Sequence, residues 1–339
     1  MELMNLNHKL IEFEPNPWIK GGDLQTIVGY YLSGTNDLDR AKLHTVQLSD
    51  GDSVVVCENR PAGHPTNARI VLLMHGLGGE AASPYMLRLA SLFRARGWIP
   101  FRMNHRGCGE GRGQAKYLYH SGRSEDVSQV LHHIEKLYPA APIVAVGFSL
   151  SGNVLLKLLG EQKHSITENL SGAMAVCPPI DLALCSDSLC RRRNWIYDFR
   201  FVQMLRAAIQ EHRKDFSDFP AFDLPWHLTL RQFDERCTAP FSGFESAEDY
   251  YAKCSANQFL ENISLPTYLL AGDDDPFIPK RTFDAVPTND FIEMHITRSG
   301  GHMGFVAAEK TPLGNRRWMD YAVVTVAESF IKEAKAYAP

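Results

Sequence analysis

Short apolar runs alternate with amphipathic segments along most of the chain. Runs of strand length occupy residues 70–74, 99–103, 143–146, 173–176, 267–271 and 291–296. Residues 86–96, 124–137, 154–159 and 318–335 instead carry apolar side chains at helical spacing. Apolar strands that alternate with helices are typical of a mostly parallel sheet covered by helices on both faces. The pattern therefore predicts an α/β fold.

Three regions depart from this alternation. Residues 1–40 contain proline and glycine breakers and predict an irregular N-terminal extension. Residues 45–48 and 53–57 flank an Asp-Gly pair, which predicts a β-hairpin. Residues 182–263 show helical stretches and proline-punctuated aromatic loops without a clear strand. We interpret residues 182–263 as a helical lid inserted into a core made of residues 1–181 and 264–339.

Composition and charge exclude several classes of protein. The chain has 339 residues, of which 45% are hydrophobic and 22% charged, as in soluble globular proteins. Its 35 basic and 39 acidic residues give a net charge of −4, so nothing favours nucleic acid as a partner. No apolar run reaches the roughly 18 residues of a membrane span, and no signal peptide is evident. We expect a cytoplasmic protein whose seven cysteines are reduced thiols.

A serine lies in a turn between a predicted strand and a predicted helix. Residues 143–146 lead into Gly147-Phe148-Ser149-Leu150-Ser151, which resembles the Gly-x-Ser-x-Gly nucleophile elbow. Such a turn exposes the central hydroxyl at the N-terminus of the next helix, where an oxyanion is favoured. Ser151 replaces the usual second glycine. Taken alone, the segment fits a small-residue turn as well as a nucleophile.

A glycine-rich loop follows the apolar run at residues 70–74. Its sequence, His75-Gly76-Leu77-Gly78-Gly79, allows close approach of the backbone to a ligand. An oxyanion hole of this kind combines one amide of such a loop with the amide that follows the nucleophile. The candidate donors are therefore the N–H groups of Leu77 and Leu150. A simple tight turn is the alternative interpretation.

A carboxylate and a histidine follow the last two predicted strands. Asp273-Asp274-Asp275 comes after residues 267–271, and His302 lies between glycines after residues 291–296. Histidine suits a general base, and a carboxylate can orient it. We prefer Asp275 as that carboxylate and keep Asp274 in reserve. The chain order Ser149, Asp275, His302 is that of a Ser-His-Asp triad in an α/β-hydrolase.

Other polar and aromatic residues allow two interpretations. Candidates for lining a pocket or bracing the glycine loop are His75, Gly76, Arg106, Tyr119 and His120, although a structural hydrogen-bond network is the simpler explanation. The lid aromatics, which either bind an acyl chain or pack the lid, are Phe199, Phe201, Phe216, Phe219, Phe222 and Trp226. The pair His132-His133 is a poor chelate because adjacent helical residues point about 100° apart. We expect no metal and no cofactor.

Several motifs together resemble the YheT-like (EMB8-like, ABHD1/2/3-related) branch of the α/β-hydrolase superfamily. They are Asp23-Leu24-Gln25-Thr26-Ile27, His75-Gly76-Leu77-Gly78-Gly79, Asn104-His105-Arg106-Gly107-Cys108-Gly109, Tyr119-His120-Ser121-Gly122, Gly147-Phe148-Ser149-Leu150, Asp249-Tyr250-Tyr251, Asp274-Asp275-Pro276 and Gly301-His302-Met303-Gly304-Phe305. The resemblance extends from about residue 12 to residue 331. It implies an α/β-hydrolase fold with a lid and hydrolysis of carboxylic esters, including acyl or lipid-like esters.

These observations predict a serine hydrolase that acts on a small-molecule ester through an acyl-enzyme. Two other functions fit the same residues. Transfer of the acyl group to an alcohol would use the same intermediate, and a binding protein without activity would result if Ser151 distorted the elbow. No motif indicates the oligomeric state.

Overall fold

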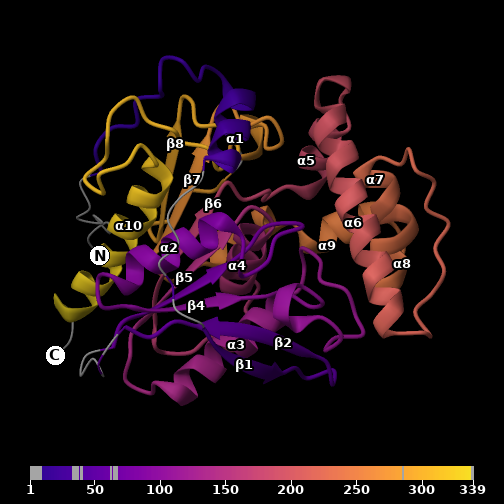
Figure 1. Cartoon of the computed structure of the whole chain (residues 1–339), viewed down its shortest axis with the longest axis horizontal. Coiled ribbons are helices and arrows are strands. Elements are labelled where there is room, and N and C mark those ends of the chain that lie inside the picture. The colour runs from indigo at the N-terminus through magenta and orange to yellow at the C-terminus, as the bar shows by residue number, and fades with distance from the viewer. Residues whose placement is uncertain are drawn as a thin grey trace.

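The computed structural model describes residues 10–32, 38, 41–61, 63, 68–284 and 286–336. An eight-stranded sheet forms its centre, in the order β1-β2-β4-β3-β5-β6-β7-β8 (Figure 1). The strands are β1 (Lys42–Gln47), β2 (Ser53–Glu58), β3 (Ile70–Met74), β4 (Ile99–Met103), β5 (Ile143–Phe148), β6 (Leu170–Val176), β7 (Thr267–Gly272) and β8 (Ile292–Thr297). Every expected strand is present, and the expected hairpin is the antiparallel pair β1–β2.

The sheet is mostly parallel. Strand β2 also pairs antiparallel with β4, whereas all pairs from β4 to β8 are parallel. The chain runs from β3 to β4 on one side and then to β5 on the other side of β3. Parallel sheets bind ligands outside the carboxyl ends of strands at such a reversal. The topology therefore points to the loops that follow β3 and β5.

Helices cover both faces of the sheet. The core helices are α2 (Pro84–Arg94), α3 (Ser124–Leu137), α4 (Leu150–Glu161) and α10 (Trp318–Ala336), with short 3₁₀ turns at Gly109–Gly111 and Lys280–Thr282. Leu72 and Met74 of β3 belong to one apolar cluster, which includes residues of α3 and α4. Val71 and Leu73 belong to another, with residues of α2 and α10. This two-sided burial explains the continuous apolar runs in the sequence.

The segment between β6 and β7 is helical throughout its regular parts. Its elements are α5 (Leu182–Leu189), η2 (Arg192–Asn194), α6 (Trp195–Asp215), α7 (Leu230–Phe233), the π-helix η3 (Asp234–Thr238), α8 (Ala239–Phe241), α9 (Ala247–Cys254) and η4 (Ala256–Asn262). Helices α6, α7 and α8 stand together to one side of the sheet (Figure 1). Residues 182–263, all of them described, contain no strand, as expected for an inserted helical block. No helix in the described ranges combines the length and hydropathy that a membrane span requires.

The prediction of an irregular N-terminal extension was wrong for residues 22–31, whereas the described residues 10–21 form no helix or strand. Helix α1 (Gly22–Tyr31) lies within it, whereas residues 1–9, 33–37, 39 and 40 lie outside the described residues. The buried side chain of Gln25 donates to the carbonyls of Ile19 and Val306 and accepts from the Val306 amide. Contacts with a distant part of the chain thus stabilise a helix that has little amphipathic pattern of its own.

Candidate active site

Ser149 occupies a strained turn between β5 and α4. Its φ of 50° and ψ of −118° lie in a region that L-residues rarely adopt. The turn is tight, because a Cβ atom on Gly147 would lie 2.3 Å from the carbonyl oxygen of Ser151. The amide of Ser149 donates to the Val176 carbonyl at 2.8 Å, which ties the turn to β6. This is the geometry expected of an elbow that presents a hydroxyl.

Ser151 fits the position where glycine is usual. Its side chain is buried, its hydroxyl donates to the His75 carbonyl, and the Nε2 atom of His105 lies 2.6 Å from its oxygen. The glycine that the packing requires is the next residue, because a Cβ atom on Gly152 would lie 2.9 Å from that of Pro178. Ser151 therefore links α4 to the glycine loop through hydrogen bonds.

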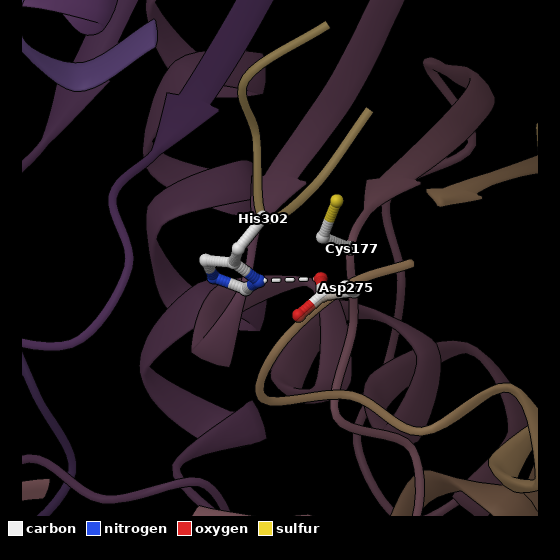
Figure 2. A group of neighbouring side chains, drawn as sticks. All are labelled: Cys177, Asp275 and His302. Atoms are coloured by element: carbon white, nitrogen blue, oxygen red, sulfur yellow. Dashed lines mark hydrogen bonds and ion pairs between the residues drawn. The ribbon is translucent and has the colours of Figure 1, made fainter. Parts of the chain in front are cut away.

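The side chain of His302 bridges Ser149 and Asp275. Its Nε2 atom lies 3.0 Å from the Ser149 hydroxyl. Its Nδ1 atom lies 2.7 Å from the Asp275 carboxylate (Figure 2). The other oxygen of Asp275 accepts from the amides of Phe277 and Ile278 at 2.8 and 3.0 Å. Because an ionised carboxylate only accepts, the proton of a neutral imidazole lies on Nδ1. The lone pair on Nε2 then faces the serine hydroxyl.

Asp274 contacts the loop around His302 rather than the imidazole. One of its oxygens accepts from the Gly301 amide at 2.8 Å, and the other accepts from the Ser299 hydroxyl at 3.0 Å. The two adjacent carboxylates thus have different partners, with Asp275 on the ring and Asp274 on the backbone of the loop.

Thr26 of α1 also holds this loop, a role that the sequence alone does not reveal. Its hydroxyl accepts from the His302 amide at 2.8 Å and donates to the Gly22 carbonyl at 2.6 Å. A Cβ atom on Gly301, where φ is +57°, would lie 2.2 Å from that carbonyl oxygen. Thr26 belongs to one of the motifs that carry the family resemblance, but the motif alone does not indicate what the hydroxyl contacts.

We expect Thr26→Val to lower kcat by roughly 3- to 10-fold, the equivalent of one neutral hydrogen bond. Valine keeps the size of threonine but leaves the His302 amide without its acceptor. Thr26→Ser retains the hydroxyl and is the matched control. Steady-state kinetics of both variants test this, and equal kcat values would contradict a positioning role for the hydroxyl.

The glycine loop approaches Ser149 and is braced by two tyrosines. A Cβ atom on Gly76 would lie 3.1 Å from that of Ser149. The amide of Gly76 donates to the hydroxyl of Tyr85 at 3.0 Å, and that of Gly78 donates to the hydroxyl of Tyr119 at 2.9 Å. Tyr85 lies in helix α2 without a recognisable motif, so nothing in the sequence marks its contact with the glycine loop.

The two candidate oxyanion donors remain available for a ligand. Within the described part of the chain, neither the Leu77 amide nor the Leu150 amide donates a hydrogen bond. Leu150 is also the first residue of α4, where a helical amide has no partner in its own helix. Both residues line the same cavity as Ser149.

Arg106 supports the site from outside the cavities. Its guanidinium contacts Asp126 at 2.6 and 2.7 Å, Asp50 at 2.6 Å and Asp52 at 2.8 Å. Asp52 in turn accepts from the backbone amides of residues 116 and 117, just before Tyr119. Of the two interpretations that the sequence allowed, the contacts of Arg106 match the structural network.

We expect Arg106→Met to lower the free energy of unfolding by about 3–5 kcal/mol, because it leaves buried carboxylates without their cation. Arg193→Met is the control. It removes an exposed pair with Asp23, in which both side chains are more than half exposed, and should cost at most about 1 kcal/mol. Urea unfolding at neutral pH measures both values, and equal losses would contradict the role assigned to Arg106.

The histidines near the glycine loop are neutral. Burial lowers the pKa of His75 to about 4 and holds the pKa values of His105 and His120 well below the usual range. The His105 ring stacks on Tyr119 with 5.2 Å between centroids, and its amide donates to Nε2 of His75 at 3.2 Å. Tyr119 and His120 line a cavity, whereas His75 lies buried behind the loop.

Two cavities meet at Ser149. The first, here called the insertion cavity, has a volume of about 130 Å³ and lies between the core and helices α5, α6, α7 and α9. The second, here called the α1 cleft, has a volume of about 230 Å³ and extends past Gly76 to α1. Both are lined by Leu77, Ser149, Phe201, Phe277 and His302. Of the lid aromatics named above, Phe201 lines both cavities, whereas Phe216, Phe219 and Phe222 pack together in a cluster of the insertion.

A thiol lies beside the His302–Asp275 pair. Cys177, Asp275 and His302 each offer one donor atom, and these atoms lie within 4.8 Å of one another (Figure 2). Metal ligation by cysteine needs a thiolate. Burial instead raises the pKa of the Cys177 thiol well above its ordinary value, and Nδ1 of His302 already bonds to Asp275. The donors fit a neutral thiol beside a hydrogen-bonded pair better than they fit a metal centre.

Comparison with known proteins identifies relatives of the chain. Residues 65–303 match the model of the Hydrolase_4 family, described as serine aminopeptidase, S33. The chain is 30% identical to "Putative esterase YheT" of Escherichia coli over 86% of this chain and 85% of that protein. It is also 30% identical to phospholipase ABHD3 of Mus musculus, over 70% of this chain and 58% of that protein.

Solved structures share the fold at low sequence identity. The esterase Pf2001 of Pyrococcus furiosus superimposes with a TM-score of 0.54 at 13% identity, over 96% of this chain and 99% of that one. The α/β-hydrolase GrgF of a Penicillium species gives 0.57 at 15% identity, over 87% and 100%. The chain therefore belongs to the Hydrolase_4 family of α/β-hydrolases, as an esterase-type member of the branch that contains YheT and ABHD3.

Proposed function

We propose that the protein is a serine hydrolase that cleaves carboxylic esters through Ser149, His302 and Asp275. The observation that carries this proposal is the double hydrogen bond of His302, at 3.0 Å to the Ser149 hydroxyl and at 2.7 Å to Asp275. The relatives of the chain, which include an esterase, phospholipases and a monoacylglycerol lipase by name, support ester substrates with an acyl chain.

In the first half-reaction, Ser149 attacks the ester carbonyl while Nε2 of His302 takes its proton. The carboxylate of Asp275 stabilises the imidazolium through Nδ1. The carbonyl oxygen becomes an oxyanion that accepts from the amides of Leu77 and Leu150, each worth about 3–4 kcal/mol in such sites. Collapse breaks the ester bond, and the alcohol leaves with the proton from His302.

In the second half-reaction, a water molecule attacks the acyl-enzyme and His302 takes its proton. Collapse of the second tetrahedral intermediate releases the acid and returns the proton to Ser149. The helical insertion at residues 182–263 is the lid in this proposal, because most of the wall of the insertion cavity comes from its helices.

A fluorophosphonate probe tests the proposal directly. We expect stoichiometric labelling of the folded protein, located by mass spectrometry on the peptide that contains Ser149. Ser151→Ala is the matched control because it removes a neighbouring hydroxyl at the same elbow, and it should retain the label. Folded wild-type protein that resists the probe would instead favour a binding protein without activity.

Acyl transfer to an alcohol is a second candidate. The relative named medium-chain fatty acid ethyl ester synthase/esterase 2 of Saccharomyces cerevisiae is 26% identical over 78% of this chain. The two cavities at Ser149 also leave space for an acyl chain and an acceptor. We expect added ethanol to divert part of the product from acid to ethyl ester. Acid as the sole product at high ethanol concentration would exclude this function.

A further inference from the structure

One carboxyl group lies in the described lining of the insertion cavity, and the reaction above does not use it. It belongs to Asp234, which is 8% exposed. Asp234 begins the π-helix η3, which follows α7 within the insertion. π-Helices are rare and frequently occur at functional sites. This combination prompts the question of what the carboxyl group binds.

Protein donors satisfy only part of this carboxylate. Its two oxygens accept from the hydroxyls of Thr238 and Tyr251, each at 2.7 Å. The Ser186 hydroxyl lies 3.1 Å from that of Tyr251 and donates to it, because the Tyr251 proton points to Asp234. A carboxylate has about four acceptor sites. Two of them remain for a ligand.

No cation of the described chain pairs with Asp234. The guanidinium of Arg231 lies 5.7 Å from the centre of the Tyr251 ring but forms its ion pairs with Asp187 and Glu248. Burial raises the pKa of Asp234 to about 6, so the carboxyl group is ionised at neutral pH. A buried charge without a counter-ion is costly, and a ligand that donates to it or neutralises it removes part of that cost.

We propose that Asp234 binds a hydrogen-bond donor of the substrate, either a hydroxyl or an ammonium group, on the part of the ester that occupies the insertion cavity. This inference rests on the proposed function, because the same cavity is lined by Ser149. Leucine and phenylalanine side chains, among them Leu189, Leu205 and Phe201, form much of the remaining lining. The site therefore selects esters in which an apolar spacer separates the reacting carbonyl from a polar or cationic end.

The inference predicts a preference for one end group over another at equal size. The substrates are two series of esters, at three chain lengths each, that end in methyl, hydroxyl or ammonium. In one series the end group is on the acyl chain of a p-nitrophenyl ester, and in the other it is on the alcohol part of an ester whose released acid is titrated. The readout is the ratio of kcat/KM for the polar end to kcat/KM for the methyl end. The series in which this ratio is high shows which half of the ester occupies the cavity.

Two variants separate ligand binding from a structural role. Asp234→Asn removes the charge and should lower the ammonium-to-methyl ratio by roughly 10- to 100-fold, as expected for a hydrogen bond to a charged group. Tyr251→Phe removes one protein donor but keeps the carboxylate, and it should retain the ratio within about 3-fold. If Asp234 only stabilised the insertion, both variants would slow all esters alike and leave the ratio unchanged.

The pH dependence of the wild-type ratio is a measurement that needs no variant. We expect the ratio for ammonium esters to fall as the pH drops through 6, where Asp234 takes up a proton. Any effect of pH on the catalytic groups shared by the two substrates cancels in the ratio, because both are compared in one enzyme at one pH. Apart from His302, the titratable side chains that accompany Asp234 in the cavity wall are Tyr119, His120, Cys185, Tyr250 and Tyr251, and Cys237 lies beside the carboxylate. Burial keeps all six neutral over this range.

Each outcome of these experiments is decisive. A preference that Asp234→Asn loses and Tyr251→Phe keeps supports the inference. Turnover of methyl esters without any end-group preference, or a preference that Asp234→Asn retains, overturns the inference and leaves the proposed function standing. Absence of turnover for every ester overturns the proposed function and this inference with it.

Discussion

Ser149→Ala is expected to lower kcat by roughly 10⁴- to 10⁶-fold while the protein stays folded. The loss is large because the variant lacks the atom that forms the acyl-enzyme, and the remaining groups act only as a unit around that atom. The substitution should leave the turn intact, since alanine adds nothing to the space around Gly147 and Gly76. Single-turnover and steady-state assays with a p-nitrophenyl ester, together with thermal unfolding, measure both quantities.

A matched substitution controls for the loss of a serine hydroxyl elsewhere in the fold. Ser128 of α3 is buried, and its hydroxyl donates to the Ser165 carbonyl at 2.6 Å. Ser128→Ala should therefore cost about 1 kcal/mol of stability and leave kcat within about 2-fold. Ester cleavage by Ser149→Ala at a rate close to that of Ser128→Ala would falsify the assignment of Ser149 as the nucleophile.

The sheet could be predicted from the sequence because its central strands are buried on both faces. All five residues of β3 are buried, and so are all six of β5, so each strand is a continuous apolar run. Helix α1 could not be predicted in this way. The residue that it buries most fully is Gln25, whose partners include Val306, about 280 positions away. Polar tertiary contacts of this kind leave no periodic trace in a sequence.

The residues of the proposed site also differ in whether the sequence predicts them. Ser149, Asp275 and His302 could be identified because each follows a strand of a parallel sheet, and the carboxyl ends of such strands share one edge. The structure places their side chains in hydrogen-bond contact, and their catalytic roles stay predictions. Thr26 contacts the backbone of a loop 276 positions away, and Tyr85 contacts that of a loop nine positions away. Their hydroxyls resemble those of any other threonine or tyrosine until the fold is known.

Asp275→Asn is expected to lower kcat by about 10⁴-fold with little effect on folding. An asparagine cannot hold a charge against the imidazolium, and its amide group can donate to Nδ1, which favours the tautomer with the proton on the wrong nitrogen. The adjacent residue supplies the control. Asp274→Asn keeps an acceptor for the Gly301 amide and should lower kcat by less than about 10-fold. Measuring kcat/KM for both variants over a pH series compares two chemically identical changes at neighbouring positions. A larger loss in Asp274→Asn than in Asp275→Asn would transfer the role of triad acid to Asp274.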